Sequence, residues 1–392
     1  MEKISNIEIL LPLINNGHIQ RYKDNNAQKT DVKKKLSNRW KNIKFLLTQL
    51  FSSSKKPDAD NWLIYETSNN YQALKFLSNN KNVFVKPFKD IRFNYLFFYK
   101  LFFFIPLYLY LSKNNKKKWF FAYFDALGLL EESERILKKH KPNKLIFSND
   151  HNPVQVALRV KAQKLGIPTY YFQHACIGLN MPPLNFDYAF LDGQDAFDKY
   201  KQIGEIKSKV ELIGVVRAHS KNLELNQNTK VKKIGLALNL YDRIEDVESL
   251  IQKLLNQYPD LNFIIRFHPA DKRNLDNIPP QLSFSNARQE NVFDFLKNID
   301  LLIAGDSAIH LDATLVNVVS IYYKFSNHKV YDIYQFVHNG LVDEAKNQSE
   351  LIIMINNQIR QKSNVLKRAA YYDEYIRSGV NYKKVLMKYD LL

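Results

Sequence analysis

The sequence predicts an α/β protein of two domains, each a parallel sheet covered by helices, that face each other across a cleft. Short apolar strands alternate with helical segments along most of the chain, which is typical of parallel sheets. The chain has 392 residues, enough for two domains with separate cores. Polar residues cluster directly after several predicted strands, where open parallel sheets bind ligands.

The first domain is predicted to span residues 1–216. Its strands are recognised as short apolar runs bounded by polar or turn residues. They are expected at Ile7–Leu13, Trp62–Tyr65, Val83–Pro87, Lys144–Ser148, Thr169–His174, Tyr188–Leu191 and Val210–Val215. Helices are predicted at Glu131–Lys139 and Val154–Leu165, and the second ends at Gly166, a natural C-cap, shortly before Pro168.

The second domain is predicted over residues 217–350, after the polar, turn-rich stretch Arg217–Lys230. A second series of strands is expected at Lys233–Leu238, Asn262–Phe267, Leu301–Ala304 and Val318–Tyr322. Helices are predicted at Asp246–Gln257 and Val292–Lys297. Residues 351–392 are predicted to form C-terminal helices without further strands.

The composition is typical of a folded protein from a reducing compartment. Hydrophobic residues make up 45% of the sequence and charged residues 24%, which argues against intrinsic disorder. Cys176 is the only cysteine, so no disulfide can form within the chain and a reducing compartment is expected. The N-terminus lacks the pattern of a secretory signal. We therefore expect a cytoplasmic location.

Positive charge is concentrated in the first part of the chain. The formal net charge is +18, and residues 1–150 carry 27 Lys/Arg against 13 Asp/Glu. The apolar run Tyr95–Leu111 is shorter than the roughly 20 residues of a membrane span, and it is followed by Lys113, Lys116, Lys117 and Lys118. We interpret it as a surface segment on the inner membrane face, where the lysines contact anionic lipid or acceptor. A buried helix and a dimer contact are the alternatives.

Two polar clusters follow strands of the first domain. Ser148-Asn149-Asp150-His151 stands at a strand end, although Asn152 and Pro153 could make this stretch an ordinary helix start. Gln173-His174 ends a later strand. Histidine titrates near neutral pH, so His174 is a candidate to take a proton from a sugar hydroxyl.

Two further clusters follow strands of the second domain. Alternation along a strand places Arg266 and His268 on the same side, before Pro269, where their nitrogens could hold a phosphate. The stretch Gly305–Ala313 resembles a tight strand-to-helix turn. Its candidate nucleotide-binding residues are Gly305, Ser307, Ala308 and Asp312. The helix start would attract an anion, and Asp312, one turn later, could reach a sugar hydroxyl.

The sequence does not indicate a metal site or a covalent nucleophile. Asp192-Gly193-Gln194-Asp195 does not form the carboxylate pair of metal-dependent transferases, and the histidine spacing does not suit zinc. No GxSxG motif is present, and Cys176 has no evident partner. We expect no cofactor.

Three motifs in order, GIPTYYFQHA, RFHPAD and GDSAIHLDA, resemble GT-B glycosyltransferases and polymerases of bacterial capsule, teichoic acid and lipopolysaccharide synthesis. Similar enzymes include sialic acid and Kdo transferases with a His-Pro motif and CDP-glycerol phosphotransferases with His-Gly and His-Pro motifs. The resemblance covers about Leu145 to Tyr323 and implies two Rossmann-like domains. It also implies an acceptor-binding N-terminal domain and a nucleotide-binding C-terminal domain.

The resemblance assigns roles to individual residues. It implies that His268 and Ser307 contact the phosphate of the leaving nucleotide and that Asp312, where such folds often have glutamate, contacts the ribose. His174 would be the general base and Asp150 its rival. This chain has His174-Ala175 where the family has His-Gly.

The resulting hypothesis is a metal-independent transferase that moves an acidic sugar from a CMP-activated donor to a surface glycan or lipid-linked acceptor. The alternatives are a CDP-glycerol or CDP-ribitol phosphotransferase, and a UDP-sugar transferase or 2-epimerase of the same fold. Nucleic acid is an unfavoured partner, because the basic residues form no recognised nucleic-acid motif.

Overall fold

The computed structural model describes residues 61–65, 74–77, 83–87, 109, 112–113, 120–220, 223–273 and 281–392. The predicted strand Ile7–Leu13 and the lysines Lys116, Lys117 and Lys118 lie outside these residues, as does most of the apolar run Tyr95–Leu111. Leu109 and Lys113 are described; both are helical and exposed. Within the described residues, no helix is both long enough and apolar enough to cross a membrane.

The chain divides into two compact units. The first contains Met1–His174, Pro182–Phe190 and Ile206–Val210. The second contains Ala175–Met181, Leu191–Glu205 and Glu211–Leu392. The second unit therefore takes in two short segments, and residues 211–216 as well, that precede the predicted end of the first domain at residue 216.

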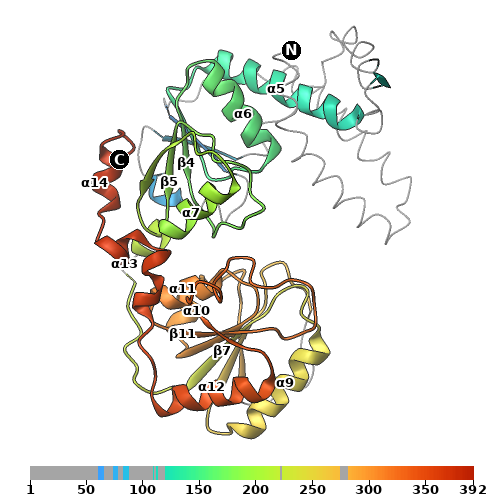
Figure 1. Ribbon diagram of the computed structural model, residues 1–392, viewed down its shortest axis with the longest axis vertical. Coiled ribbons are helices and arrows are strands. Elements are labelled where there is room, and N and C mark those ends of the chain that lie inside the picture. The colour runs from blue at the N-terminus through green and yellow to red at the C-terminus, as the bar shows by residue number, and fades with distance from the viewer. Residues whose placement is uncertain are drawn as a thin grey trace. The chain divides into compact units, whose positions relative to one another are not determined.

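The first sheet has six strands in the order β2-β1-β3-β4-β5-β6 (Figure 1). The strands are β1 (Asn61–Tyr65), β2 (Val83–Pro87), β3 (Lys144–Phe147), β4 (Thr169–Phe172), β5 (Tyr188–Leu191) and β6 (Lys209–Leu212). Neighbours from β2 through β5 pair in parallel. The helices α5 (Phe120–His140) and α6 (Pro153–Lys164) pack against each other.

The second sheet also has six strands, in the order β12-β11-β10-β7-β8-β9, and all its pairs are parallel. The strands are β7 (Lys233–Ala237), β8 (Asn262–Arg266), β9 (Leu282–Ser285), β10 (Leu301–Ala304), β11 (Val319–Tyr323) and β12 (Asp343–Ala345). The helices of this unit include α7 (Gln194–Ile203), α8 (Val216–His219), α9 (Ile244–Gln257), α10 (Val292–Lys297), α11 (Ile309–Leu315) and α12 (Gln348–Arg360).

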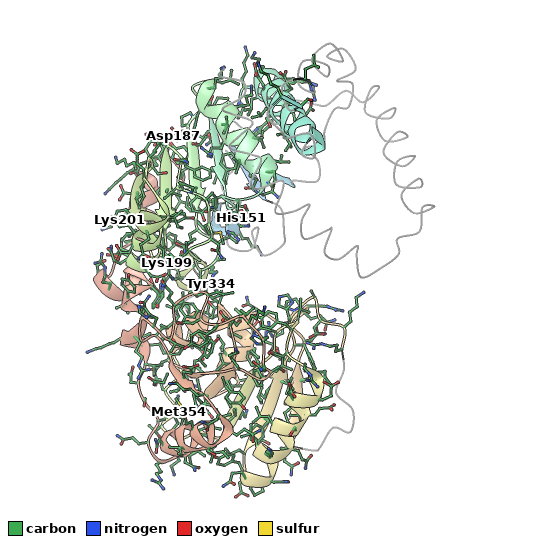
Figure 2. All side chains as sticks on the ribbon, turned by 45° about the vertical axis from the view of Figure 1, so that its right-hand side comes forward. His151, Asp187, Lys199, Lys201, Tyr334 and Met354 are labelled. Atoms are coloured by element: carbon green, nitrogen blue, oxygen red, sulfur yellow. The ribbon has the colours of Figure 1, made fainter. Side chains whose placement is uncertain are left out.

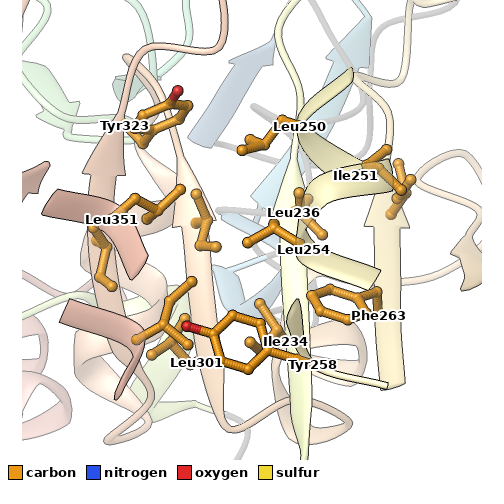
Figure 3. Packing of buried hydrophobic residues seen from close by; sticks show 14 of the residues in the cluster. Ile234, Leu236, Leu250, Ile251, Leu254, Tyr258, Phe263, Leu301, Tyr323 and Leu351 are labelled. Carbon is orange, nitrogen blue, oxygen red and sulfur yellow. The ribbon is translucent and has the colours of Figure 1, made fainter. Parts of the chain in front are cut away.

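Alternate residues of the second sheet enter two different cores. On β10, Leu301 and Ile303 pack with residues of α9 and α12, as Figure 3 shows for Leu301. Leu302 and Ala304 pack instead with residues of α10 and α11. Helices therefore cover both faces, which is the arrangement expected of a parallel sheet with buried strands.

The central strands were predicted to within a few residues, and the differences have local causes. Strand β4 ends at Phe172, so His174 lies in the following loop. Strand β6 ends at Leu212, ahead of Gly214, whose φ of 79° does not continue a strand. The sequence did not predict β9 and β12, the two edge strands of the second sheet, because they are short and partly polar.

A buried lysine connects α7 to the loop after β11. Lys199 Nζ donates to Asp195 Oδ2 at 2.8 Å and to Tyr334 O at 2.7 Å, and Figure 2 labels Lys199 and Tyr334. Burial raises the pKa of Asp195 to about 6, while Lys199 acts in the opposite direction. Both ends of this buried charge pair are thus hydrogen-bonded, as burial requires.

The C-terminal residues are helical, as predicted, and they pack closely on two glycines. After α12 come a 3₁₀ helix (Leu366–Tyr371), α13 (Glu374–Ser378) and α14 (Tyr382–Met387). A Cβ atom at Gly193 would lie 2.4 Å from Tyr372 C, and one at Gly214 would lie 2.7 Å from Asp373 Oδ1. The buried Asp373 carboxylate accepts the Val215 N–H at 3.2 Å and lies 2.5 Å from His219 Nε2.

We expect Gly193→Ala to destabilise the protein, because the added methyl group would meet backbone atoms that cannot rotate away. A loss of roughly 1–3 kcal/mol is typical of overpacking. Gly178→Ala is the matched control, since its Cβ would lie 3.4 Å from Ile333 Cγ2 and 3.8 Å from Ile333 O, which are ordinary contact distances. Urea unfolding of both variants measures the effect, and equal stability of the two would contradict the prediction.

Candidate functional site

The turn after β10 is held by a buried histidine. His310 Nε2 lies 2.8 Å from Gly305 O, and His310 Nδ1 lies 2.6 Å from Ser320 Oγ. A carbonyl oxygen can only accept, so Nε2 carries the proton and Nδ1 accepts the hydroxyl of Ser320. Burial lowers the pKa of His310 to about 4, so the ring is neutral at neutral pH. No role for His310 was predicted from the sequence.

Asp306 connects the same turn to the loop after β11. Its carboxylate is buried and accepts the Tyr322 hydroxyl at 3.0 Å and the Ile333 N–H at 2.9 Å. Burial raises the pKa of Asp306. Asp306 lies before α11 and acts as a bridge between loops, while Ser307 and Ala308 remain partly exposed.

Arg266, at the end of β8, binds groups of the protein. Its guanidinium donates to Ser285 Oγ and, at 2.9 Å, to Glu290 O, and it lies over the ring of Phe295 at 5.3 Å. Arg266 is buried, and burial lowers its pKa. Its visible function is to fix the loop between β9 and α10, and a contact with a phosphate stays a prediction.

His268 is exposed, and its hydrogen bonding defines its tautomer. The Ala270 N–H donates to His268 Nδ1 at 3.1 Å. When the ring is neutral, its proton must therefore be on Nε2. Pro269 is also exposed, and its carbonyl accepts Arg288 Nε at 2.8 Å. The loop thus presents a positioned N–H donor on an exposed side chain.

The loops after β7, β8 and β10 form one hydrogen-bonded network. Arg273 Nη2 donates to Asn239 O at 2.9 Å, and Asn239 Nδ2 donates to Asp306 O at 3.2 Å. Tyr241 OH also donates to Asp306 O at 3.2 Å. The predicted clusters around His268 and Ser307 are therefore connected at the carboxyl edge of the second sheet.

Asp312 lies on α11 and is paired with Arg217. Arg217 Nη1 donates to Asp312 Oδ1, and the Asp312 side chain is only 9% exposed. Asp192 belongs to the same cluster: burial raises its pKa and the charge of Arg217 opposes that shift. The sequence gave no signal for Arg217 as a partner, and the ribose contact of Asp312 stays a prediction.

The turn after β3 in the first unit brings together Asp150 and His151, as Figure 2 shows for His151. Asp150 Oδ1 and His151 Nδ1 are 2.9 Å apart. Asn152 Oδ1 accepts the Val154 N–H at 3.0 Å, so the alternative interpretation of this stretch as a helix N-cap is confirmed. His174, half-buried, follows the adjacent parallel strand β4.

Within the described residues, the geometry supports neither a cysteine nucleophile nor a metal site. Cys176 is buried, and burial raises the pKa of its thiol, which therefore stays protonated. Within the part of the chain that the structure describes, no group of three or more His, Cys, Asp or Glu side chains could hold a metal ion.

Comparison with solved structures identifies the architecture. UDP-GlcNAc 2-epimerase from Neisseria meningitidis, bound to UDP-GlcNAc, aligns over 84% of this chain and 99% of its own, with 13% identity and a TM-score of 0.51. The glycotransferase of kitacinnamycin aligns over 86% of this chain and 100% of its own, with 12% identity and a TM-score of 0.53. The chain has the GT-B fold.

A third structure agrees with this assignment. UDP-N-acetylglucosamine 2-epimerase from Rickettsia bellii aligns over 84% of this chain and 95% of its own, with 14% identity and a TM-score of 0.51. No family model and no curated protein matches the sequence. Identities this low show the GT-B fold alone, and the prediction of two Rossmann-like domains is confirmed.

We expect His310 to make stability depend on pH. Its pKa falls from 6.5 to about 4 on folding, so its contribution is complete above pH 6.5 and is lost as pH falls toward 4. The loss is on the order of 3 kcal/mol. Urea unfolding of the wild type and His310→Gln at pH 7 and pH 4 measures it, and the difference between the two proteins should shrink at pH 4. A pH-independent difference would contradict this assignment.

Gln155 offers a second test of stability. Its side chain is fully buried on α6, and neither Nε2 nor Oε1 has a hydrogen-bond partner in the described structure. Such a group costs about 1–3 kcal/mol, so Gln155→Met should raise the free energy of unfolding. Gln163→Met, on the same helix, should lower it, because Gln163 Nε2 donates to Asn185 O at 2.9 Å. Equal losses of unfolding free energy in both variants would show that the Gln155 side chain has hydrogen-bond partners after all.

Proposed function

We propose that the protein is a nucleotide-sugar-dependent glycosyltransferase whose donor binds at the carboxyl edge of the second sheet. The observation that carries this proposal is the rigid turn at Gly305–Ala308, connected by hydrogen bonds to the loop that presents His268. Ligands of open parallel sheets bind at this edge. The order of the surrounding motifs resembles that of GT-B transferases.

The chemistry requires stabilisation of a departing phosphate. Negative charge develops on the phosphate oxygen as the bond to the sugar breaks. His268 is exposed and Ser307 partly exposed, so the His268 Nε2–H and the Ser307 hydroxyl are two candidate donors, and Lys272 adds an exposed positive charge. We propose that these groups, with no metal ion, hold the leaving nucleotide.

We propose a CMP-linked acidic sugar as the donor, because the His-Pro motif and its neighbours resemble sialic acid and Kdo transferases. A CDP-glycerol or CDP-ribitol phosphotransferase is the alternative within this resemblance. A UDP-sugar transferase or 2-epimerase is the second candidate, favoured by the shared fold of an epimerase bound to UDP-GlcNAc.

We propose that the acceptor is a surface glycan or a lipid-linked precursor at the inner membrane face. The excess of basic residues in positions 1–150 supports an anionic surface as a partner. Leu109 is 60% exposed, and Lys113, four residues later in the sequence, is exposed as well. An exposed leucine beside a lysine suits the headgroup layer of a membrane.

A thermal-shift screen with CMP, CDP, UDP and GDP, without metal, tests the donor site. CMP should raise the melting temperature, because a ligand of the folded state stabilises it. His268→Ala should weaken CMP binding by about 10- to 100-fold, as expected for a hydrogen bond to a charged group. His338→Ala, an exposed histidine outside the network, is the matched control.

The other outcomes are equally informative. Stabilisation by UDP alone would favour the UDP-sugar transferase or epimerase. Unchanged CMP affinity in His268→Ala would remove His268 from the site. The proposal is falsified if no nucleotide binds.

A further inference from the structure

We infer that Arg288 is a positioning residue, which holds His268 in the orientation and tautomer needed to donate a hydrogen bond to the leaving nucleotide. This inference rests on the proposed function and deepens it, because it names a residue that controls the proposed donor site. Arg288 belongs to the loop between β9 and α10, whereas His268 follows β8. Both residues lie in the second compact unit, and both are exposed.

Arg288 binds the turn that carries His268 at two points. This turn is closed by the Asp271 N–H, which donates to His268 O at 2.8 Å, and it has Pro269 at its second position, where proline is favoured. Arg288 Nε donates to Pro269 O at 2.8 Å, and Arg288 Nη2 donates to Asp271 O at 2.8 Å. The donors of a guanidinium lie in one rigid plane, so the two bonds fix the turn relative to the Arg288 side chain.

The bond to Pro269 O acts on the peptide group that orients the His268 ring. Pro269 O and the Ala270 N–H belong to the same planar peptide group. The oxygen accepts from Arg288, and the N–H donates to His268 Nδ1 at 3.1 Å. A rotation of this peptide that broke one of the two bonds would therefore break the other. Hydrogen bonds in such a chain also polarise one another, so the charged donor at one end strengthens the N–H donor at the other end.

This chain of hydrogen bonds decides which nitrogen of His268 can donate. While Nδ1 accepts the Ala270 N–H, the proton of the neutral ring is on Nε2. Nε2–H is the proposed donor to the departing phosphate, where negative charge develops. Arg288 thus acts on the nucleotide through the Pro269–Ala270 peptide and the His268 ring.

The loop that carries Arg288 is itself held in place. The Arg288 N–H donates to Asn286 Oδ1 at 3.1 Å. The buried Arg266 donates to Glu290 O at 2.9 Å, two residues further along the same loop. A group that positions another must have a defined position of its own, and these contacts supply it. They also give Arg266 a part in the site, since it supports the loop from which Arg288 reaches the turn.

A spectroscopic test of the inference needs no ligand. The ¹⁵N chemical shifts of the two ring nitrogens of His268 report which nitrogen carries the proton, at a pH where the ring is neutral. The wild type should contain the Nε2–H form alone. Arg288→Gln should contain the Nδ1–H form beside it, because the Pro269–Ala270 peptide is then free to turn. Arg288→Lys, which keeps a charged donor, should lie between the two, and the missing signals of His268→Ala identify the ring.

The binding test uses CMP in the thermal-shift assay. Arg288→Gln should weaken CMP binding by about 3- to 10-fold, less than His268→Ala, because the hydrogen-bond donor is misplaced rather than removed. The double variant with both substitutions should bind CMP no more weakly than His268→Ala alone, since residues that act through one another are not additive. Arg360→Gln is the matched control, because it removes the same charge from an exposed position on α12 and should leave CMP affinity unchanged.

Two results would overturn the inference, and they differ from a failure of the proposed function. If the His268 ring of Arg288→Gln has the same tautomer as the wild type, the peptide does not depend on Arg288. If the losses of CMP affinity add in the double variant, Arg288 contacts the nucleotide directly and does not act through His268. If the wild-type protein binds no CMP, the proposed donor falls, and the ¹⁵N shifts still decide whether Arg288 fixes the His268 ring.

Discussion

The second sheet depends on the hydrogen bond from the buried His310 ring to Gly305 O. A strand-to-helix turn leaves backbone carbonyls that must find partners away from water. His310 satisfies the carbonyl of Gly305 from within the following helix, and Ser320 on β11 satisfies the other ring nitrogen. Burial keeps the ring neutral, and Nδ1 of the neutral ring accepts the Ser320 hydroxyl. The shape of the turn that presents Ser307 is thus secured from the protein interior.

The need of buried polar groups for internal partners also decides which polar residues remain available to a ligand. Charged groups removed from water need internal partners, so Arg266 binds the β9–α10 loop and Arg217 binds Asp312. Arg266 and Asp312, which the sequence suggested as ligand contacts, thus have protein partners in the structure. His268, by contrast, is exposed, and its Nδ1 accepts the Ala270 N–H.

The sequence predicted the central strands and the sheet edge that carries the polar clusters, because both follow from local patterns. Buried strands such as Leu301–Ala304 are continuous apolar runs, and topology then places their carboxyl ends at one edge. The sequence could not predict which side chains pair across the fold. Arg217 and Asp312 are 95 residues apart, and no local pattern connects them. The pairing of neighbouring residues was no easier to predict. Asp150 and His151 are adjacent in the sequence, but polar residues of this kind precede many helices.

The charges at the donor edge bear on the nature of the leaving group. The phosphate of a CMP-sugar carries one negative charge, whereas the diphosphate of a UDP-sugar carries two. In the described network, the guanidinium groups of Arg266 and Arg273 are bound to protein groups, and the oriented donor that remains exposed is His268 Nε2–H, with Lys272 nearby. A site with so little free positive charge is better matched to a single phosphate, because each further charge taken out of water needs its own partner. This electrostatic match agrees with the proposed nucleoside monophosphate donor; the cytosine base is inferred from the resemblance of the motifs alone.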